Sequence, residues 1–173
     1  PRSRAAASTG AAAGAGGAPA RGGVRRYRWR VRRRVSWIGS MPVPVPPERA
    51  WELFSRVQDW PEWDWMGSAD ARWLSGTPWT PGAGLRVGHR PGTFDCIITD
   101  ARPPCQVVWE GRGLWFHGRH AFCFRPHPGG CLVVTAETFT GAGAPLLRPL
   151  IRWFWRRQLR AFRRWAAAPG GGR

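Results

Sequence analysis

The stretch "PPERAWELFSRVQDWPEWDW" (residues 46–65) carries more structural information than any other part of the chain. Two prolines precede an acidic residue, and the apolar residues from Trp51 to Val57 follow at near-helical spacing. Proline suits a first helical turn because it lacks the N–H that would be unpaired there, and the spacing puts the apolar residues on one face. The stretch therefore predicts a short amphipathic helix, followed by a turn that Pro61 fixes.

Alternating apolar and polar residues flank this stretch on both sides and predict strands. One run precedes it, "RVSWIGSMPV" (residues 34–43). Six runs bounded by Gly or Pro follow it, at residues 69–76, 84–90, 92–101, 105–113, 114–126 and 129–141. The connections are too short for parallel crossovers, so we predict seven antiparallel strands. A long helix with Pro145 near its start and Pro169 after its end completes the chain.

This order of elements predicts a chamber. A sheet with one apolar face must cover that face, and the final helix is the only large element available for it. A strongly twisted sheet around one helix cannot close the space completely, so a concave apolar pocket is expected between them. The fold class is therefore α+β, and a ligand site is expected inside it.

The sequence resembles the SRPBCC superfamily over about residues 35–168. The resemblance rests on residues 46–65 together with "PGAGLRV", "VVWEGRG", "RHAFCF" and "AETFTG", which follow in the family's order. It implies the helix-grip fold of START domains, birch-pollen-type allergens and polyketide cyclase/dehydrase-like proteins. In that fold a seven-stranded curved antiparallel sheet wraps around a long C-terminal helix, with two short helices after the first strand. Trp60 and Trp63 would then close the rim of the chamber.

The net charge of +17 is concentrated near the chain ends. Residues 1–34 contain ten Arg and residues 146–166 seven, both without an acid, whereas residues 35–145 hold nine Arg against ten acids. We expect residues 1–34 and 169–173 to be disordered tails around one domain, residues 35–168. No nucleic-acid reading motif accompanies the basic segments, so only non-specific nucleic-acid binding is left as a third functional choice. No apolar run is long enough to span a membrane, and we expect a cytoplasmic protein.

Metal and cofactor sites are not expected. Cys96, Cys105, Cys123 and Cys131 lack the close pairing of a zinc site and lie in apolar runs, which favours reduced and mostly buried thiols. Strand alternation sends His117 to the opposite face from His120.

The same alternation predicts which side chains face the chamber. The candidate ligand-binding residues are Trp73, Leu85, Val87, His89, Phe94, Ile98, Val107, Trp109, Phe116, His120, Phe122, Glu137, Phe139, Leu147, Ile151 and Phe154. His120 and Glu137 are expected to be cross-strand neighbours. Two interpretations stay open for them: a hydrogen-bonded pair that shapes the cavity or orients a ligand, or an acid/base couple for an aldol cyclisation or dehydration. Binding or transport of a lipid, polyketide or isoprenoid is the leading function, and an aromatase/cyclase-type enzyme is the alternative.

The final helix has a second, basic face. Its apolar stripe is expected to close the chamber, while Arg156, Arg157, Arg160 and Arg164 lie opposite. Such a helix suits an anionic membrane surface, but an ordinary lid helix with a solvated basic face fits the pattern as well. We expect a monomer or a weak dimer.

Overall fold

The computed structural model describes residues 34–65, 69–89, 92–113 and 116–169. The tails predicted for residues 1–34 and 169–173 lie almost entirely outside the described residues. Their inner boundaries do not: Arg34 begins the first strand, one residue before the predicted start of the domain.

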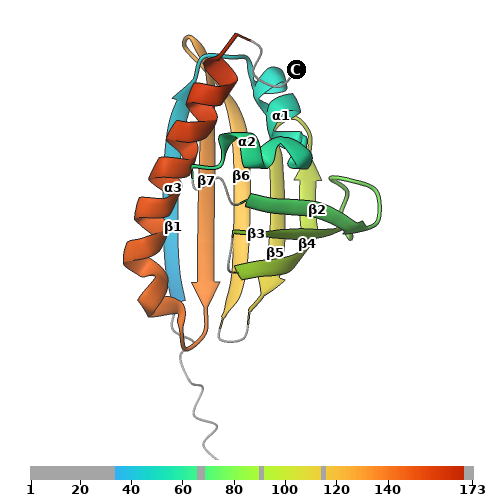
Figure 1. The fold of residues 1–173 in the computed structure, drawn as a ribbon, viewed down its shortest axis with the longest axis vertical. Helices are drawn as coiled ribbons and strands as arrows, with labels where there is room; N and C mark the ends of the chain where they lie inside the picture. Colours follow the sequence, from blue (N-terminus) through green and yellow to red (C-terminus); the bar gives the residue numbers. More distant parts are fainter. Residues whose placement is uncertain (1–33, 66–68, 90–91, 114–115, 170–173) are drawn as a thin grey trace, which may run out of the picture. The chain divides into compact units, whose positions relative to one another are not determined.

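Seven strands form one antiparallel sheet in the order β1-β7-β6-β5-β4-β3-β2 (Figure 1). Along the chain the elements are β1 (Arg34–Val43), α1 (Pro47–Ser55), the 3₁₀ turn η1 (Val57–Asp59), α2 (Trp60–Trp63), β2 (Ala69–Ser75), β3 (Gly84–His89), β4 (Gly92–Arg102), β5 (Gln106–Arg112), β6 (His117–His127), β7 (Gly130–Thr140) and α3 (Ala144–Ala167). The predicted α+β helix-grip architecture is confirmed. The turn η1 between the two short helices was not predicted.

Local sequence explains where the helices begin. Pro47 occupies the first turn of α1. Glu48 lies in the same turn, where its negative charge interacts favourably with the positive end of the helix dipole. Pro149 lies inside α3, near its start, so it interrupts little of the backbone hydrogen bonding.

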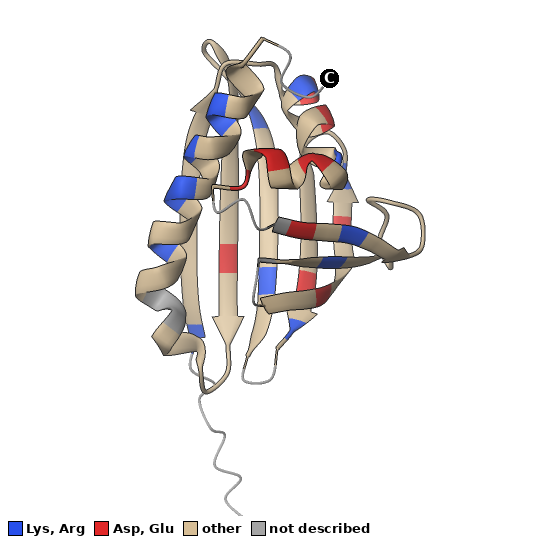
Figure 2. Ribbon diagram, in the orientation of Figure 1, with Lys and Arg blue, Asp and Glu red and all other residues tan. Residues whose placement is uncertain are grey.

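Figure 1 shows α3 running along β1 and β7, and its basic residues lie in a row in Figure 2.

The core fills one end of the concave sheet face. Phe54 of α1 is buried at its centre, with ring centroids of Phe122 at 4.6 Å and Phe124 at 5.2 Å. Trp60 donates its indole N–H to the carbonyl of Phe54 at 2.7 Å, and Trp63 packs edge-to-face on Phe162. Because both tryptophans are inside this core, they do not close the rim of the chamber as we predicted.

Candidate functional site

A cavity of about 460 Å³ lies between the concave face of the sheet and α3, at the end that α1 and α2 leave uncovered. It is lined by residues of β3 to β7, by the first half of α3, and by Trp65 after α2 and Phe116 before β6. Eight of these side chains are aromatic: Trp65, Phe94, Trp109, Phe116, Phe139, Trp153, Phe154 and Trp155. The volume lies within the range of about 300–1,000 Å³ that small-molecule sites occupy.

Glycines make the floor of the cavity hollow. Gly111 on β5 and Gly118 on β6 are cross-strand partners, and both line the cavity. A Cβ atom on Gly111 would lie 2.8 Å from the sulfur of Cys96, and one on Gly118 would lie 3.1 Å from the ring of Phe139. Side chains at these two positions would therefore push into neighbours that now bound the cavity.

His120 and Glu137 form the polar centre of the cavity. They are direct partners in the register of β6 and β7, as the alternation predicted. Nδ1 of His120 lies 3.8 Å from Oε1 of Glu137, and its Nε2 shares a 2.6 Å hydrogen bond with the hydroxyl of Thr135. Trp155 donates its indole N–H to Oε2 of Glu137. Neighbours on β7 and α3 thus hold both groups in place.

Burial moves the two pKa values in opposite directions. It lowers the pKa of His120 to about 3, because the charged imidazolium is disfavoured away from water. It raises the pKa of Glu137 to about 7, although the hydrogen bond from Trp155 acts the other way. At neutral pH the imidazole is uncharged and the carboxyl group is close to half-ionised. Such a carboxyl group can accept or donate a proton near pH 7.

The mouth of the cavity is bordered by two tryptophans and an arginine. The rings of Trp65 and Trp153 meet edge-to-face at 4.7 Å, and the guanidinium of Arg157 lies 5.3 Å and 4.8 Å from their centroids. These cation–π contacts join the segment after α2 to the middle of α3.

The structure brings nine of the sixteen predicted residues to the cavity. These are Val87, Phe94, Trp109, Phe116, His120, Glu137, Phe139, Ile151 and Phe154. Five others occupy the same sheet face but lie in the filled core beneath α1 and α2 or against it: Trp73, Leu85, Ile98, Val107 and Phe122. Alternation assigns a face, but it does not show how far along that face the short helices extend. The side chains of His89 and Leu147 lie outside the described residues.

Several lining residues were not predicted. Trp155 is not among the predicted residues, although it follows Ile151 by one helical turn and so shares its stripe. Cys96 lines the cavity as a free thiol, and burial raises its pKa to about 12, so it stays protonated. Trp65, Gly88, Gly111, Gly118, Leu150 and Trp153 complete the set.

Neither a metal site nor a disulfide stands out. Within the described ranges, no three or more His, Cys, Asp and Glu side chains are grouped to hold a metal ion. All four cysteines are free; Cys96 and Cys131 are buried, whereas Cys105 is exposed.

Comparison with known proteins places the chain in a family. The model of the family described as polyketide cyclase/dehydrase and lipid transport matches residues 34–166. The chain belongs to this family. The predicted SRPBCC resemblance is thereby confirmed, since the polyketide cyclase/dehydrase and lipid transport family is one of its branches. A search of curated protein sequences found no match.

Several solved structures share the fold of this family member, although their sequence identity to it is low. The di-domain ARO/CYC BexL from the BE-7585A biosynthetic pathway is 14% identical, with a TM-score of 0.63 over 79% of this chain and 51% of BexL. Ara h 8.0201 is 12% identical, with a TM-score of 0.61 over 77% and 97%. A Thalictrum norcoclaurine synthase point mutant with a transition-state analogue is 11% identical, with a TM-score of 0.60 over 78% and 95%. The chain thus spans about half the length of BexL.

Proposed function

We propose that this protein binds a hydrophobic small molecule, a polyketide, isoprenoid or lipid, in the cavity between the sheet and α3. The observation that carries the proposal is an aromatic lining that surrounds a single buried pair of polar groups. Aromatic side chains contribute large apolar contact areas and stack on flat ligands, while one or two placed polar groups orient the ligand. The lining therefore favours a flat, unsaturated ligand over a flexible acyl chain. If the protein releases the bound molecule to another protein or to a membrane, it acts as a carrier.

Filling the cavity is expected to prevent binding. Val87 lines the cavity from β3, so Val87→Trp puts an indole into the space that a ligand would occupy. We expect the affinity for the neutral fluorescent probe N-phenyl-1-naphthylamine to fall at least about tenfold, which is about 1.4 kcal/mol. Fluorescence titration measures this, and competition with neutral representatives of the three classes, an anthraquinone, farnesol and methyl palmitate, ranks them.

The matched control is Ile97→Trp on the neighbouring strand β4. Ile97 is half exposed and does not line the cavity, so the same kind of enlargement leaves the cavity open. Equal affinities in both variants would contradict the binding site. A neutral probe is needed because the Arg-rich segments attract anionic dyes.

A second candidate function is acid/base catalysis on the bound molecule. The specific observation is that Glu137, with its pKa raised to about 7, faces the cavity beside a neutral His120. An ionised Glu137 can remove a proton from the carbon next to a ligand carbonyl, leaving the electron pair on the enolate oxygen. This is the first step of an aldol cyclisation or a dehydration.

Proton exchange tests this candidate directly. In D₂O the protein is expected to accelerate exchange of the α-protons of 2-tetralone, a flat apolar ketone, with a rate that rises as the pH passes through about 7 because the base must be ionised. Glu137→Gln should lower the rate about a hundredfold or more while the probe still binds. NMR follows the exchange. Exchange no faster than in buffer, or an unchanged exchange rate in Glu137→Gln, would contradict acid/base catalysis. Ligand binding would then be the one function still proposed.

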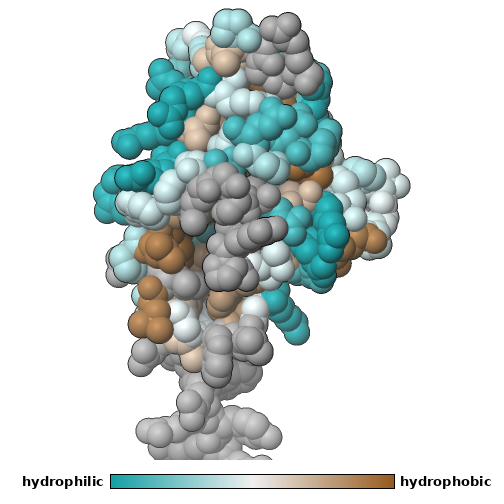
Figure 3. Space-filling view, in the orientation of Figure 1, coloured by the Kyte–Doolittle hydropathy of each residue, from teal (hydrophilic) through white to brown (hydrophobic). Residues whose placement is uncertain are grey.

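The predicted anionic membrane partner would contact the first half of α3, the part of the helix that also lines the cavity. Leu146, Leu150 and Trp153 are exposed at helical spacing on α3, and Figure 3 shows hydrophobic surface over the first half of this helix. Apolar side chains beside arginines are what an anionic lipid surface would bind. Within the described residues, no helix combines the length and apolarity that a membrane crossing requires. The membrane partner, the cytoplasmic location, the monomeric or weakly dimeric state and the lack of specific nucleic-acid binding stay predictions.

A further inference from the structure

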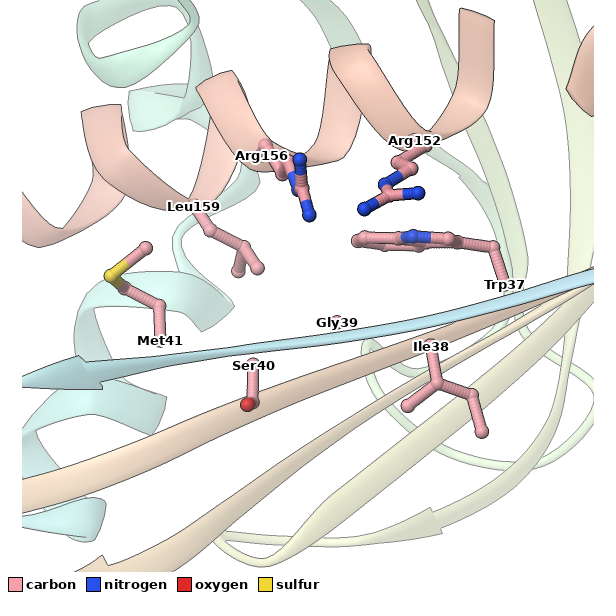
Figure 4. A pocket seen from close by; sticks show the side chains of 8 residues that line it. All are labelled: Trp37, Ile38, Gly39, Ser40, Met41, Arg152, Arg156 and Leu159. Atoms are coloured by element: carbon pink, nitrogen blue, oxygen red, sulfur yellow. The ribbon is translucent and has the colours of Figure 1, made fainter. Parts of the chain in front are cut away.

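A second groove, of about 420 Å³, lies between β1 and α3 on the side away from the cavity described above. Trp37, Ile38, Gly39, Ser40 and Met41 line it from β1, and Arg152, Arg156 and Leu159 line it from α3 (Figure 4). The two elements run in the same direction along the groove, with Arg152 beside Trp37 and Leu159 beside Met41.

The groove reaches the free edge of the sheet. β1 is the terminal strand in the sheet order, and β7 is its neighbour on the other side. A pocket on one face of a strand is lined by alternate residues, whereas this groove is lined by five consecutive residues of β1. The side chains of Ile38 and Ser40 point away from α3 in Figure 4, so these residues border the groove with their backbone.

Among the residues that the structure describes, no strand pairs with this edge of β1, so a further strand can add there. Natural edge strands are usually protected by charged residues, proline or a covering element. The segment from Trp37 to Met41 has neither charge nor proline, and Ile38 is 71% exposed. Gly39 lets the ring of Trp37 lie flat along the strand, since a Cβ there would collide with that ring. The floor of the groove is therefore flat.

Charge selects the occupant. Arg152 and Arg156 extend from α3 into the groove (Figure 4), and neither forms an ion pair with a described residue. None of the described residues that line the groove is acidic. The Arg-rich, acid-free residues 1–33 would be repelled by these arginines, and a second copy would bring the same arginines to the contact. The complementary occupant is an acidic segment from another protein.

The spacing of the arginines fits a strand. Residues four apart on a helix are about 6 Å apart along its axis, and alternate residues of a strand are about 6.6 Å apart. Because α3 and β1 run alongside each other, carboxylates at alternate positions of an added strand would lie opposite Arg152 and Arg156. Backbone hydrogen bonds to β1 would supply affinity, and the two ion pairs would supply selectivity.

We propose that the groove between β1 and α3 binds an extended acidic peptide segment of a partner protein, which adds to the sheet beside β1 with acidic residues at alternate positions. This inference is independent of what the aromatic cavity binds, because the two sites share no lining residue.

Fluorescence anisotropy of the full chain with three labelled peptides tests the proposal. The first peptide has Glu at alternate positions with Thr and Val between them. In the second, Lys replaces Glu, and in the third, Pro replaces the intervening residues, which removes backbone donors but keeps the charge. We expect saturable binding of the first peptide and at least about tenfold weaker binding of the other two. Hydrogen exchange should slow at those amides of residues 37–41 that point away from β7 when the first peptide binds.

The matched variants are Arg152→Glu/Arg156→Glu and Arg160→Glu/Arg164→Glu. Both pairs are four residues apart on α3 and change the net charge equally, but the second pair does not line the groove. Only the first is expected to weaken binding, by about tenfold or more. Equal weakening in both variants, equal binding of the Pro peptide, displacement by inorganic phosphate, or a dimer with residues 37–41 protected without peptide would overturn the proposal.

Discussion

Glu137→Gln is expected to stabilise the protein progressively as the pH rises from 4.5 to above 7. Burial raises the pKa of Glu137 from 4.5 to about 7, so the folded state holds a proton that the unfolded state releases across this window. The stability contributed by this proton is complete below pH 4.5 and is lost as the pH passes through about 7. The difference corresponds to roughly 3 kcal/mol. Glutamine has no charge to bury and keeps an oxygen that accepts the indole N–H of Trp155.

His120 acts in the opposite direction and explains why the variant must be compared with the wild type at each pH. Burial lowers its pKa from 6.5 to about 3, so the unfolded state binds the proton first and stability is lost as the pH falls from 6.5 to 3. Between pH 4.5 and 6.5 the two contributions nearly cancel in the wild type. In Glu137→Gln only that of His120 remains, and stability should rise through this range.

Urea unfolding followed by far-UV circular dichroism at pH 4.5, 6 and 8 measures the difference in the free energy of unfolding. The control is Glu110→Gln on the outer face of the sheet, where Glu110 pairs with His117 and Arg119 in partly exposed contacts. It should not become more stable than the wild type at pH 8. Parallel pH profiles for Glu137→Gln and the wild type would show that Glu137 is not held protonated by the cavity.

Phe54→Ala is expected to lower the free energy of unfolding by about 3–5 kcal/mol. Phe54 is buried, and its ring contacts seven other rings from α1, α2, α3, the sheet and the loop between β2 and β3: Trp51, Trp60, Trp79, Trp109, Phe122, Phe124 and Phe162. Removal of this ring leaves a void that the surrounding tryptophans are too large and rigid to fill. The short helices and the sheet lose the side chain that joins them.

Phe94→Ala is the matched control, because Phe94 is 38% exposed beside the cavity and contacts the ring of Phe116. It should cost less than about 1 kcal/mol. Phe54→Leu extends the series if Phe54→Ala does not fold, with an expected loss between the two. Urea unfolding at fixed pH gives the order. Equal losses at Phe54 and Phe94 would mean that the core is not centred on Phe54.

Alternation of side chains along the strands predicts only part of the cavity. It places His120 opposite Glu137, because the side-chain period of two and the short turn between β6 and β7 leave one register that buries the apolar set. Alternation predicts Leu85, Ile98 and Phe122 as cavity residues in the same way as Val87 and Phe94, because all of them face the concave side of the sheet. Which of them meets ligand-sized space depends on where α1 and α2 end, and this is a matter of packing between distant segments.

The sequence by itself determined the architecture, the cross-strand pair and the basic face of α3, since these follow from local periods, prolines and glycines. Only the tertiary structure decided that Trp60 and Trp63 fill the core while Trp65 borders the cavity. Trp60 packs on Phe54 of α1 and Trp109 of β5, whereas Trp63 and Trp65 pack on Phe162 and Trp153, at different positions along α3. The tertiary structure also decided that Trp155 holds Glu137 and that Arg152 and Arg156 lie over the free edge of β1. The physical reason in each case is long-range packing, which brings distant segments such as α3 against one another and which no local pattern records.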